Sequence, residues 1–147
     1  MLNRIFGGFP GWGPFFLRLG VGVIMIAHGA QKLFGIWGGS GLTGFSKMMA
    51  SMGLKPAMAW AVLVALVEFV GGIFLVLGIM TRLSALLIGV VMVVAIVGVH
   101  WGGGLFASNG GFEFPLMILA GSICLLLTGG GRAAGDDLPL RAQRHIG

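Results

Sequence analysis

Glu68 is the residue in this chain whose type and position most strongly suggest chemistry. It lies in the middle of an apolar stretch, residues 60–80, that is long enough to cross a bilayer. An acidic side chain at the centre of a spanning helix costs roughly 2.5–3.5 kcal/mol to insert, and it is tolerated where it faces the bundle interior and finds a partner or a ligand. The chain has only four acidic residues, so the partner of Glu68 is the first question that the sequence poses.

Depth within the membrane identifies a candidate for that partner. Counting about 1.5 Å of rise per residue from the ends nearest the first long loop, Glu68 lies roughly 16 Å and His28 roughly 12 Å below the outer surface. We therefore predict that His28 is the partner of Glu68 and that the two form the catalytic pair of the site. Gln31 and Lys32 share one broad face of the first span with His28, because residues three and four apart are neighbours on a helix.

Other ionisable residues border the same half of the membrane. His100 ends the third predicted span and Glu113 begins the fourth. Together with His28, Lys32 and Glu68, these two residues predict a half-buried polar pocket that opens toward the outer leaflet. Its predicted ligand-binding residues are Lys32, Gln31, His100 and Glu113. Such a pocket suits a small amphipathic ligand with hydrogen-bonding oxygens, or a proton relay. Each residue also has a structural explanation: Glu68 could only lock two helices, His100 and Glu113 could be solvated caps, and Lys32 could extend to the interface.

The composition assigns the chain to the integral membrane proteins. It is 57% hydrophobic and only 9% charged, and a soluble domain of this length has too little interior to bury so much apolar side chain. We predict an all-α membrane protein, a bundle of four transmembrane helices at about 15–36, 57–80, 83–101 and 112–128. Residues 1–14 form an N-terminal segment, residues 15–129 the bundle domain, and residues 130–147 a polar tail.

Basic residues next to the spans predict the topology. An even number of spans places both termini on one side, which carries Arg4, Arg82, Arg132, Arg141 and Arg144, against Lys47 and Lys55 on the other. The positive-inside rule then makes both termini cytoplasmic. Arg18 and Arg82 form an inner group with a structural or partner-facing role. No uninterrupted apolar segment typical of a cleavable signal peptide precedes the first span.

The first outer loop, residues 37–56, contains a predicted short amphipathic helix. Its apolar residues recur at helical spacing, at Leu42, Phe45, Met48, Met49 and Met52. Gly53 then offers a helix stop. We expect this helix to lie on the outer interface, either as an ordinary cover of the bundle or as a gate over a lipid-soluble ligand.

Several redox mechanisms are excluded by the residues. Cys124 is the only cysteine, so the chain has no intramolecular dithiol relay. His28 and His100 differ too much in depth to face one another across a haem. We predict no metal and no nucleotide cofactor, and no nucleic-acid partner because the arginines flank the spans. Quinone is the redox species that fits these limits.

The same residues carry a family resemblance. Residues 17–35, LRLGVGVIMIAHGAQKLFG, resemble the first span of the DoxX family, and residues 68–86, EFVGGIFLVLGIMTRLSAL, resemble its second hallmark. Residues 43–54, 110–121 and 129–137 are similar to its intervening segment and to the two ends of its last span. The resemblance implies a four-helix bundle in a bacterial cytoplasmic (inner) membrane. It points to Arg18, His28, Lys32, Glu68, Arg82 and Glu113.

The resemblance also implies a role in membrane redox systems, including quinone-linked oxidation and oxidoreductase complexes with soluble partners. Our leading hypothesis is a membrane subunit of a quinone-linked oxidoreductase, with membrane lipids, a redox partner subunit and further copies of the chain as partners. One alternative is a non-catalytic scaffold whose polar residues only lock the bundle and dock a partner. A small permease is disfavoured because four spans leave little room for alternating access.

Overall fold

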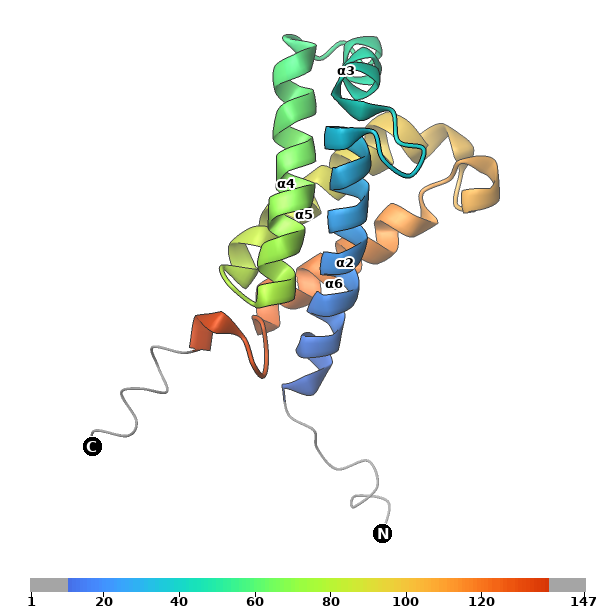
Figure 1. Ribbon diagram of the computed structural model, residues 1–147. Helices are drawn as coiled ribbons and strands as arrows, with labels where there is room; N and C mark the ends of the chain where they lie inside the picture. The colour runs from blue at the N-terminus through green and yellow to red at the C-terminus, as the bar shows by residue number, and fades with distance from the viewer. Residues whose placement is uncertain (1–10, 138–147) are drawn as a thin grey trace, which may run out of the picture.

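The fold is all-helical in a computed structural model that describes residues 11–137, with no β-strand in that range. The bundle helices are α2 (Trp12–Phe34), α4 (Ala57–Leu77), α5 (Thr81–Ala95) and α6 (Glu113–Thr128), and α3 (Gly41–Ser51) covers one end of it (Figure 1). The predicted fold class is therefore confirmed. The remaining residues, 1–10 and 138–147, include Arg4, Arg141 and Arg144 of the topology argument, which lie outside the described residues.

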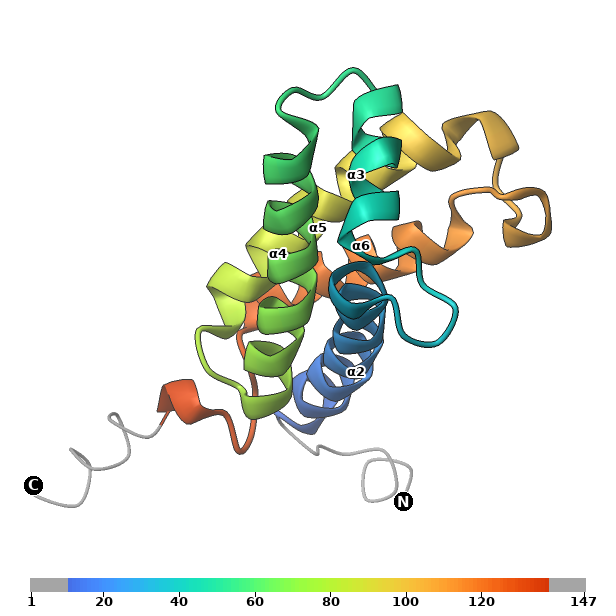
Figure 2. The ribbon, with the colours of Figure 1, turned by 45° about the horizontal axis from the view of Figure 1, so that its top comes forward.

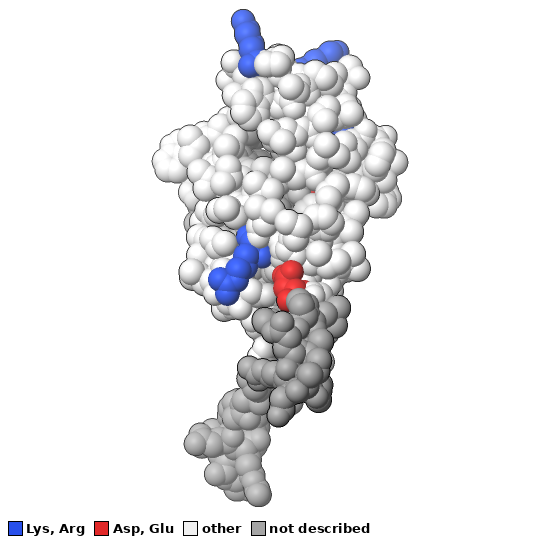
Figure 3. Space-filling model, turned by 90° about the vertical axis from the view of Figure 1, so that its left-hand side faces the viewer, with Lys and Arg blue, Asp and Glu red and all other residues white. Residues whose placement is uncertain are grey.

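Within residues 11–137, three helical segments are long and apolar enough to cross a membrane. They are α2, α4 and the continuous stretch Thr81–Gly103, in which α5 runs into the π-helix η1 (Ile96–His100) and the 3-10 turn η2 (Trp101–Gly103). The 16 residues of α6 span about 24 Å, somewhat less than a hydrocarbon core of about 30 Å. On the face drawn in Figure 3, charged side chains gather at the two ends and leave an uncharged belt between them. The chain is a multi-pass membrane protein.

The bundle consists of two antiparallel pairs. Helices α2 and α4 pack along one another, and α5 and α6 form a second pair that runs obliquely to the first (Figures 1 and 2). The start of α2, the α4–α5 turn and the 3-10 turn η4 (Gly135–Asp137) meet at one end, which we call the terminal end. Helix α3 lies at the other, which we call the α3 end.

Glycines let α2 and α4 approach closely at two levels. A Cβ atom on Gly22 would lie 2.8 Å from the carbonyl oxygen of Gly72, and a Cβ atom on Gly29 would lie 2.7 Å from the Cα atom of Phe69. Membrane helices use small residues in this way to bring their backbones together. The contact at Gly29 places α2 directly against the turn of α4 that carries Glu68.

The buried residues of α4 form one narrow stripe. They follow one another at alternating spacings of four and three residues: Ala61, Ala65, Glu68, Gly72 and Leu75. This spacing keeps one helix face toward the bundle, while leucine and valine side chains on the other faces are exposed, as at Leu63 and Val70. Glu68 is therefore on the inward face of its helix.

Helix α3 has the predicted amphipathic pattern. Phe45 and Met49 are buried and pack with Ala61 near the start of α4, whereas Lys47 and Met48 are exposed. The apolar face of α3 thus closes the space above α2 and α4, and its polar face points away from the bundle.

Candidate functional site

Glu68 pairs with Lys32. The ammonium group of Lys32 donates to both carboxylate oxygens of Glu68, and the Glu68 side chain is 1% exposed while that of Lys32 is 23% exposed. This finding corrects the pairing inferred from depth, in which His28 was the partner. A full positive charge compensates a buried carboxylate better than a neutral imidazole does, which is how the bundle tolerates Glu68.

The direction of helical side chains explains why Lys32 reaches this depth. Side chains on a helix point back toward its N-terminus, and α2 runs from the terminal end to the α3 end (Figure 1). The Lys32 amine is therefore carried from the edge of the span toward its middle. One turn earlier on the same face, Gly29 allows the close contact with Phe69, so the amine and the carboxylate meet.

Helix α3 covers this ion pair. The Lys32 amine lies 5.0 Å from the centre of the Phe45 ring, a cation–π arrangement, and Phe45 is only 5% exposed. The segment leading into α3 is held against α2, because the Gln31 side-chain amide donates to the Trp37 carbonyl at 3.1 Å. At Gly39, a Cβ atom would lie 2.6 Å from the Cα atom of Gln31. Gln31 thus holds the segment before α3, the helix that covers the ion pair, against α2.

His28 lies one helical turn from Lys32 and faces a different neighbour. Its imidazole is half-buried, and its ring centre is 5.6 Å from that of Phe114 on α6. Within residues 11–137 the His28 ring makes no hydrogen bond. Its nitrogens consequently retain their capacity to donate to, or accept from, a ligand in this part of the bundle.

His100 and Glu113 hold the connection between η1 and α6. The Nδ1 atom of His100 lies 2.8 Å from the Gly110 carbonyl oxygen, and the Ala107 backbone N–H donates to Glu113 Oε1 at 2.7 Å. The predicted ligand set is therefore divided between two places. Lys32 and Glu68 form an ion pair with His28 one turn away on α2, whereas His100 and Glu113 bind backbone groups of their own loop.

Arg18 is a hub of hydrogen bonds at the terminal end. It is 2% exposed, its guanidinium lies 5.0 Å from the centre of the Phe15 ring, and it makes no ion pair within the described residues. The guanidinium instead donates to carbonyl oxygens from two segments, Leu75 and Val76 on α4, and Gly130 and Ala133 after α6. Arg18 thereby ties the end of α4 to the segment that follows the last helix.

Asp136 caps the start of α5. Its carboxylate oxygens accept hydrogen bonds from the backbone N–H groups of Met80 at 2.7 Å and Thr81 at 2.9 Å, which would otherwise lack partners at a helix N-terminus. Partial burial raises the pKa of Asp136, but these hydrogen bonds and the charge of Arg18 outweigh it, so its pKa lies below the usual value. Sequence reasoning did not identify this cap, although the N-cap residue Met80 has no side chain that could provide one.

Arg82 lies at the same end with its side chain exposed, close to the glycine-rich segment after α6. Cys124 is exposed on α6. Within residues 11–137, no group of three histidine, cysteine or acidic side chains is arranged to hold a metal ion.

Comparisons with known proteins agree with the resemblance in the sequence. Residues 13–101 match the family described as DoxX. Over 133 residues the chain is 29% identical to a protein of Bacillus subtilis (strain 168) named "Putative oxidoreductase CatD", and the match covers 90% of this chain and 91% of that protein. No solved structure matches the chain.

Proposed function

The chain belongs to the DoxX family, and we propose that it is a membrane subunit of a redox system that binds a quinone, or a similar lipid-soluble molecule, beside Lys32 and Glu68. The observation that carries this proposal is the ion pair itself, set in an apolar bundle, with a buried carboxylate and a lysine that stays partly exposed. Intramembrane charges of this kind commonly mark substrate or proton pathways. The name of the similar Bacillus protein supports a redox role.

The geometry suggests how the residues share the work. Both oxygens of Glu68 are engaged by Lys32, so Glu68 acts as a positioning residue that holds the ammonium charge inside the membrane. An ammonium group has three donors, and one remains for a ligand oxygen. His28, one turn away on α2, supplies the second contact. Lys32 and His28 are therefore the residues expected to touch the ligand.

This donor set fits the head of a quinone, which offers two carbonyl oxygens. A bound quinone would supply two-electron, two-proton redox chemistry. Lys32 would hold one oxygen by a charge-assisted hydrogen bond, and His28 would exchange a proton at the other, because an imidazole both donates and accepts protons near neutral pH. Electrons would come from a partner subunit.

We also place the protein in a bacterial cytoplasmic membrane with both termini in the cytoplasm. The support is the charge distribution: Arg82 and Arg132 lie near the terminal end, and Lys47 and Lys55 near the α3 end. In the sequence, Arg4, Arg141 and Arg144 add to the basic residues of the two termini.

A second candidate function is a structural scaffold. It is favoured by the way in which Arg18, His100 and Glu113 bind backbone groups of this same chain. If the ion pair of Lys32 and Glu68 has the same purpose, it locks α2 to α4 and binds nothing.

Quinone-dependent thermal stabilisation distinguishes the two functions. Short-chain ubiquinone and menaquinone analogues are added to the detergent-solubilised protein, and the unfolding temperature is measured for the native chain, Lys32→Gln and the matched control Lys47→Gln, whose lysine is exposed on α3. We expect the stabilisation by quinone to vanish in Lys32→Gln and to persist in Lys47→Gln. A Lys32→Gln protein that is less stable but is stabilised by quinone as much as the native chain would establish the scaffold.

A further inference from the structure

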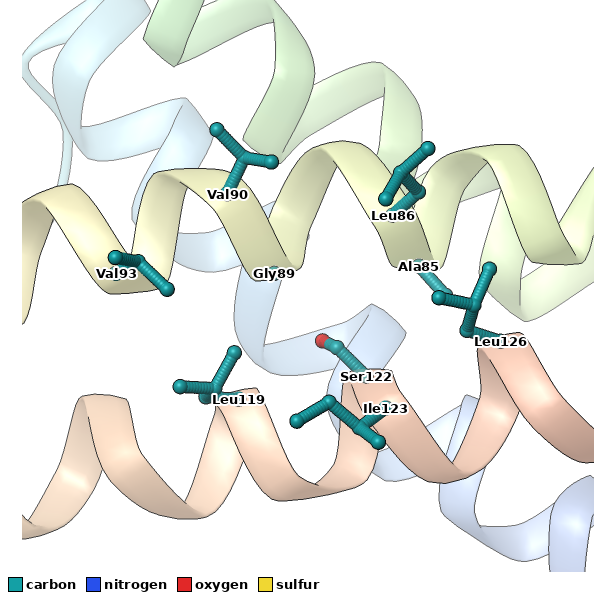
Figure 4. Close-up of a pocket in the computed structure, with 9 residues that line it drawn as sticks. All are labelled: Ala85, Leu86, Gly89, Val90, Val93, Leu119, Ser122, Ile123 and Leu126. Atoms are coloured by element: carbon teal, nitrogen blue, oxygen red, sulfur yellow. The ribbon is translucent and has the colours of Figure 1, made fainter.

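Two cavities follow one another along the seam between α5 and α6. The first, of about 510 Å³, lies at the terminal end between the start of α5, the end of α6 and the glycine segment that follows. The second, of about 170 Å³, lies further along the two helices and is bordered mainly by apolar side chains. Among these side chains, the Ser122 hydroxyl on α6 points toward α5 (Figure 4).

Helix geometry places both cavities on the same face of the seam. Arg82 borders the first cavity, and Leu86 and Val90, four and eight residues later on α5, border the second. On α6, Leu126 borders the second cavity one turn before Gly129 and Gly130, which border the first. Residues four apart stack on one helix face, so a polar cavity at the helix ends leads into an apolar groove within the span.

The polar cavity carries charges of both signs. Arg82 and Asp136 both border it, both are exposed, and they form no ion pair with each other. Each Asp136 oxygen accepts one backbone N–H and retains a second lone pair. The buried Thr81 side chain lies in the same wall, next to Asp136. Basic and acidic atoms lie side by side at this end in Figure 3.

We propose that this seam is a binding site for a phospholipid with a phosphoethanolamine headgroup. Arg82 binds the phosphate, for which a guanidinium is well suited. Asp136 accepts hydrogen bonds from the ammonium group, and one acyl chain follows the groove past Leu86 and Leu126. Lipid headgroups lie at the same depth in the membrane as the ends of the spanning helices. This site is separate from Lys32 and Glu68, so the lipid proposal can be tested independently of the proposed function.

Lipid retention measured by native mass spectrometry tests the headgroup. The full chain in detergent is mixed with phosphatidylethanolamine, phosphatidylglycerol or phosphatidylcholine that have identical acyl chains. We expect phosphatidylethanolamine to be retained about tenfold better than the other two, because phosphatidylglycerol lacks the cation and phosphatidylcholine has no N–H group to donate to Asp136. Equal retention of all three lipids, or retention of none, would overturn the proposal.

Two pairs of matched variants test the location. Arg82→Gln should lower the retention of phosphatidylethanolamine about tenfold, whereas Arg132→Gln, at the same end but outside the cavity, should not. Ile123→Trp should block the groove, whereas Leu127→Trp, also exposed on α6 but outside the groove, should not. Circular dichroism and gel filtration confirm that each variant is folded. The site is refuted if the control of either pair loses as much lipid as its test variant.

Discussion

Helix α2 carries two basic residues, Arg18 and Lys32, that the fold treats in opposite ways. They are separated by about 21 Å along the helix. Arg18 is almost completely buried, has no acidic partner within the described residues, and binds four backbone carbonyl groups. Lys32 has one acidic partner, Glu68, and remains partly exposed.

The chemistry of the two side chains explains the difference. A guanidinium has five N–H donors in a rigid plane, so Arg18 can satisfy several carbonyls at once, including those at the end of α4, where the helix dipole is negative. Those bonds leave little capacity for a ligand. The ammonium group of Lys32 is a compact charge with three donors, and two of its bonds go to Glu68. Arg18 therefore serves the fold, whereas Lys32 is suited to binding.

The largest expected effect is the loss of Arg18. Arg18→Met removes the guanidinium and leaves the carbonyls of Val76, Gly130 and Ala133 without the donor that they have in the native chain, so we expect the free energy of unfolding to fall by about 3–5 kcal/mol. Arg18→Lys should recover little of it, because a lysine has fewer donors and no planar fork. Unfolding in detergent, followed by circular dichroism, measures both. Near-native stability of Arg18→Met would remove the distinction between the two cations.

A smaller effect is expected at the ion pair. Glu68→Gln leaves the charge of Lys32 without its partner, and we expect a loss of about 2–3 kcal/mol, less than for a fully buried pair because Lys32 is partly exposed. Replacing both residues, with Glu68→Leu and Lys32→Met together, should recover most of the stability while quinone stabilisation stays absent. A double-mutant cycle on unfolding free energies gives the interaction free energy between the side chains of Lys32 and Glu68. Recovered stability together with intact quinone stabilisation would contradict the assigned site.

The smallest expected effect is the loss of stability at low pH that comes from Asp136 at the terminal end. Because the folded-state pKa of Asp136 is lowered, its carboxylate contributes stability that is present above its unfolded pKa of about 3.9 and is lost as the pH falls through the folded value. The contribution should be less than about 1 kcal/mol, since the group is exposed and screened. We expect the unfolding temperature to drop less between about pH 5 and about pH 3 in Asp136→Asn than in the native chain. Identical pH profiles would show that the cap adds no stability.

Much of the fold could be predicted because it follows from local patterns. The apolar runs and the spacing of Phe45 and Met49 predict the helices, and α4 begins at Ala57 as expected after Pro56. The ends differ where backbone conformation decides them. Helix α4 stops at Leu77 rather than residue 80, because Gly78 adopts a left-handed conformation with φ of 69°, which ends a helix.

The candidate site was less predictable. The cost of a buried carboxylate correctly placed Glu68 on an inward face, but counting depth located only Cα atoms. The backward tilt of helical side chains then decided that Lys32, and not His28, reaches the carboxylate. Gly29 was a usable signal, since a glycine one turn before Lys32 marks a close approach of α4.

By itself the sequence determined the membrane class, the positions of the bundle helices, the amphipathic α3 and the inward position of Glu68, because these depend on hydrophobicity and spacing within single segments. Only the tertiary structure decided the partners. Arg18 meets the carbonyl of Gly130, 112 residues away, and Asp136 caps a helix that begins 55 residues earlier at Thr81. Such contacts depend on how the helices are rotated and packed against one another, and the pattern within one helix does not specify that rotation.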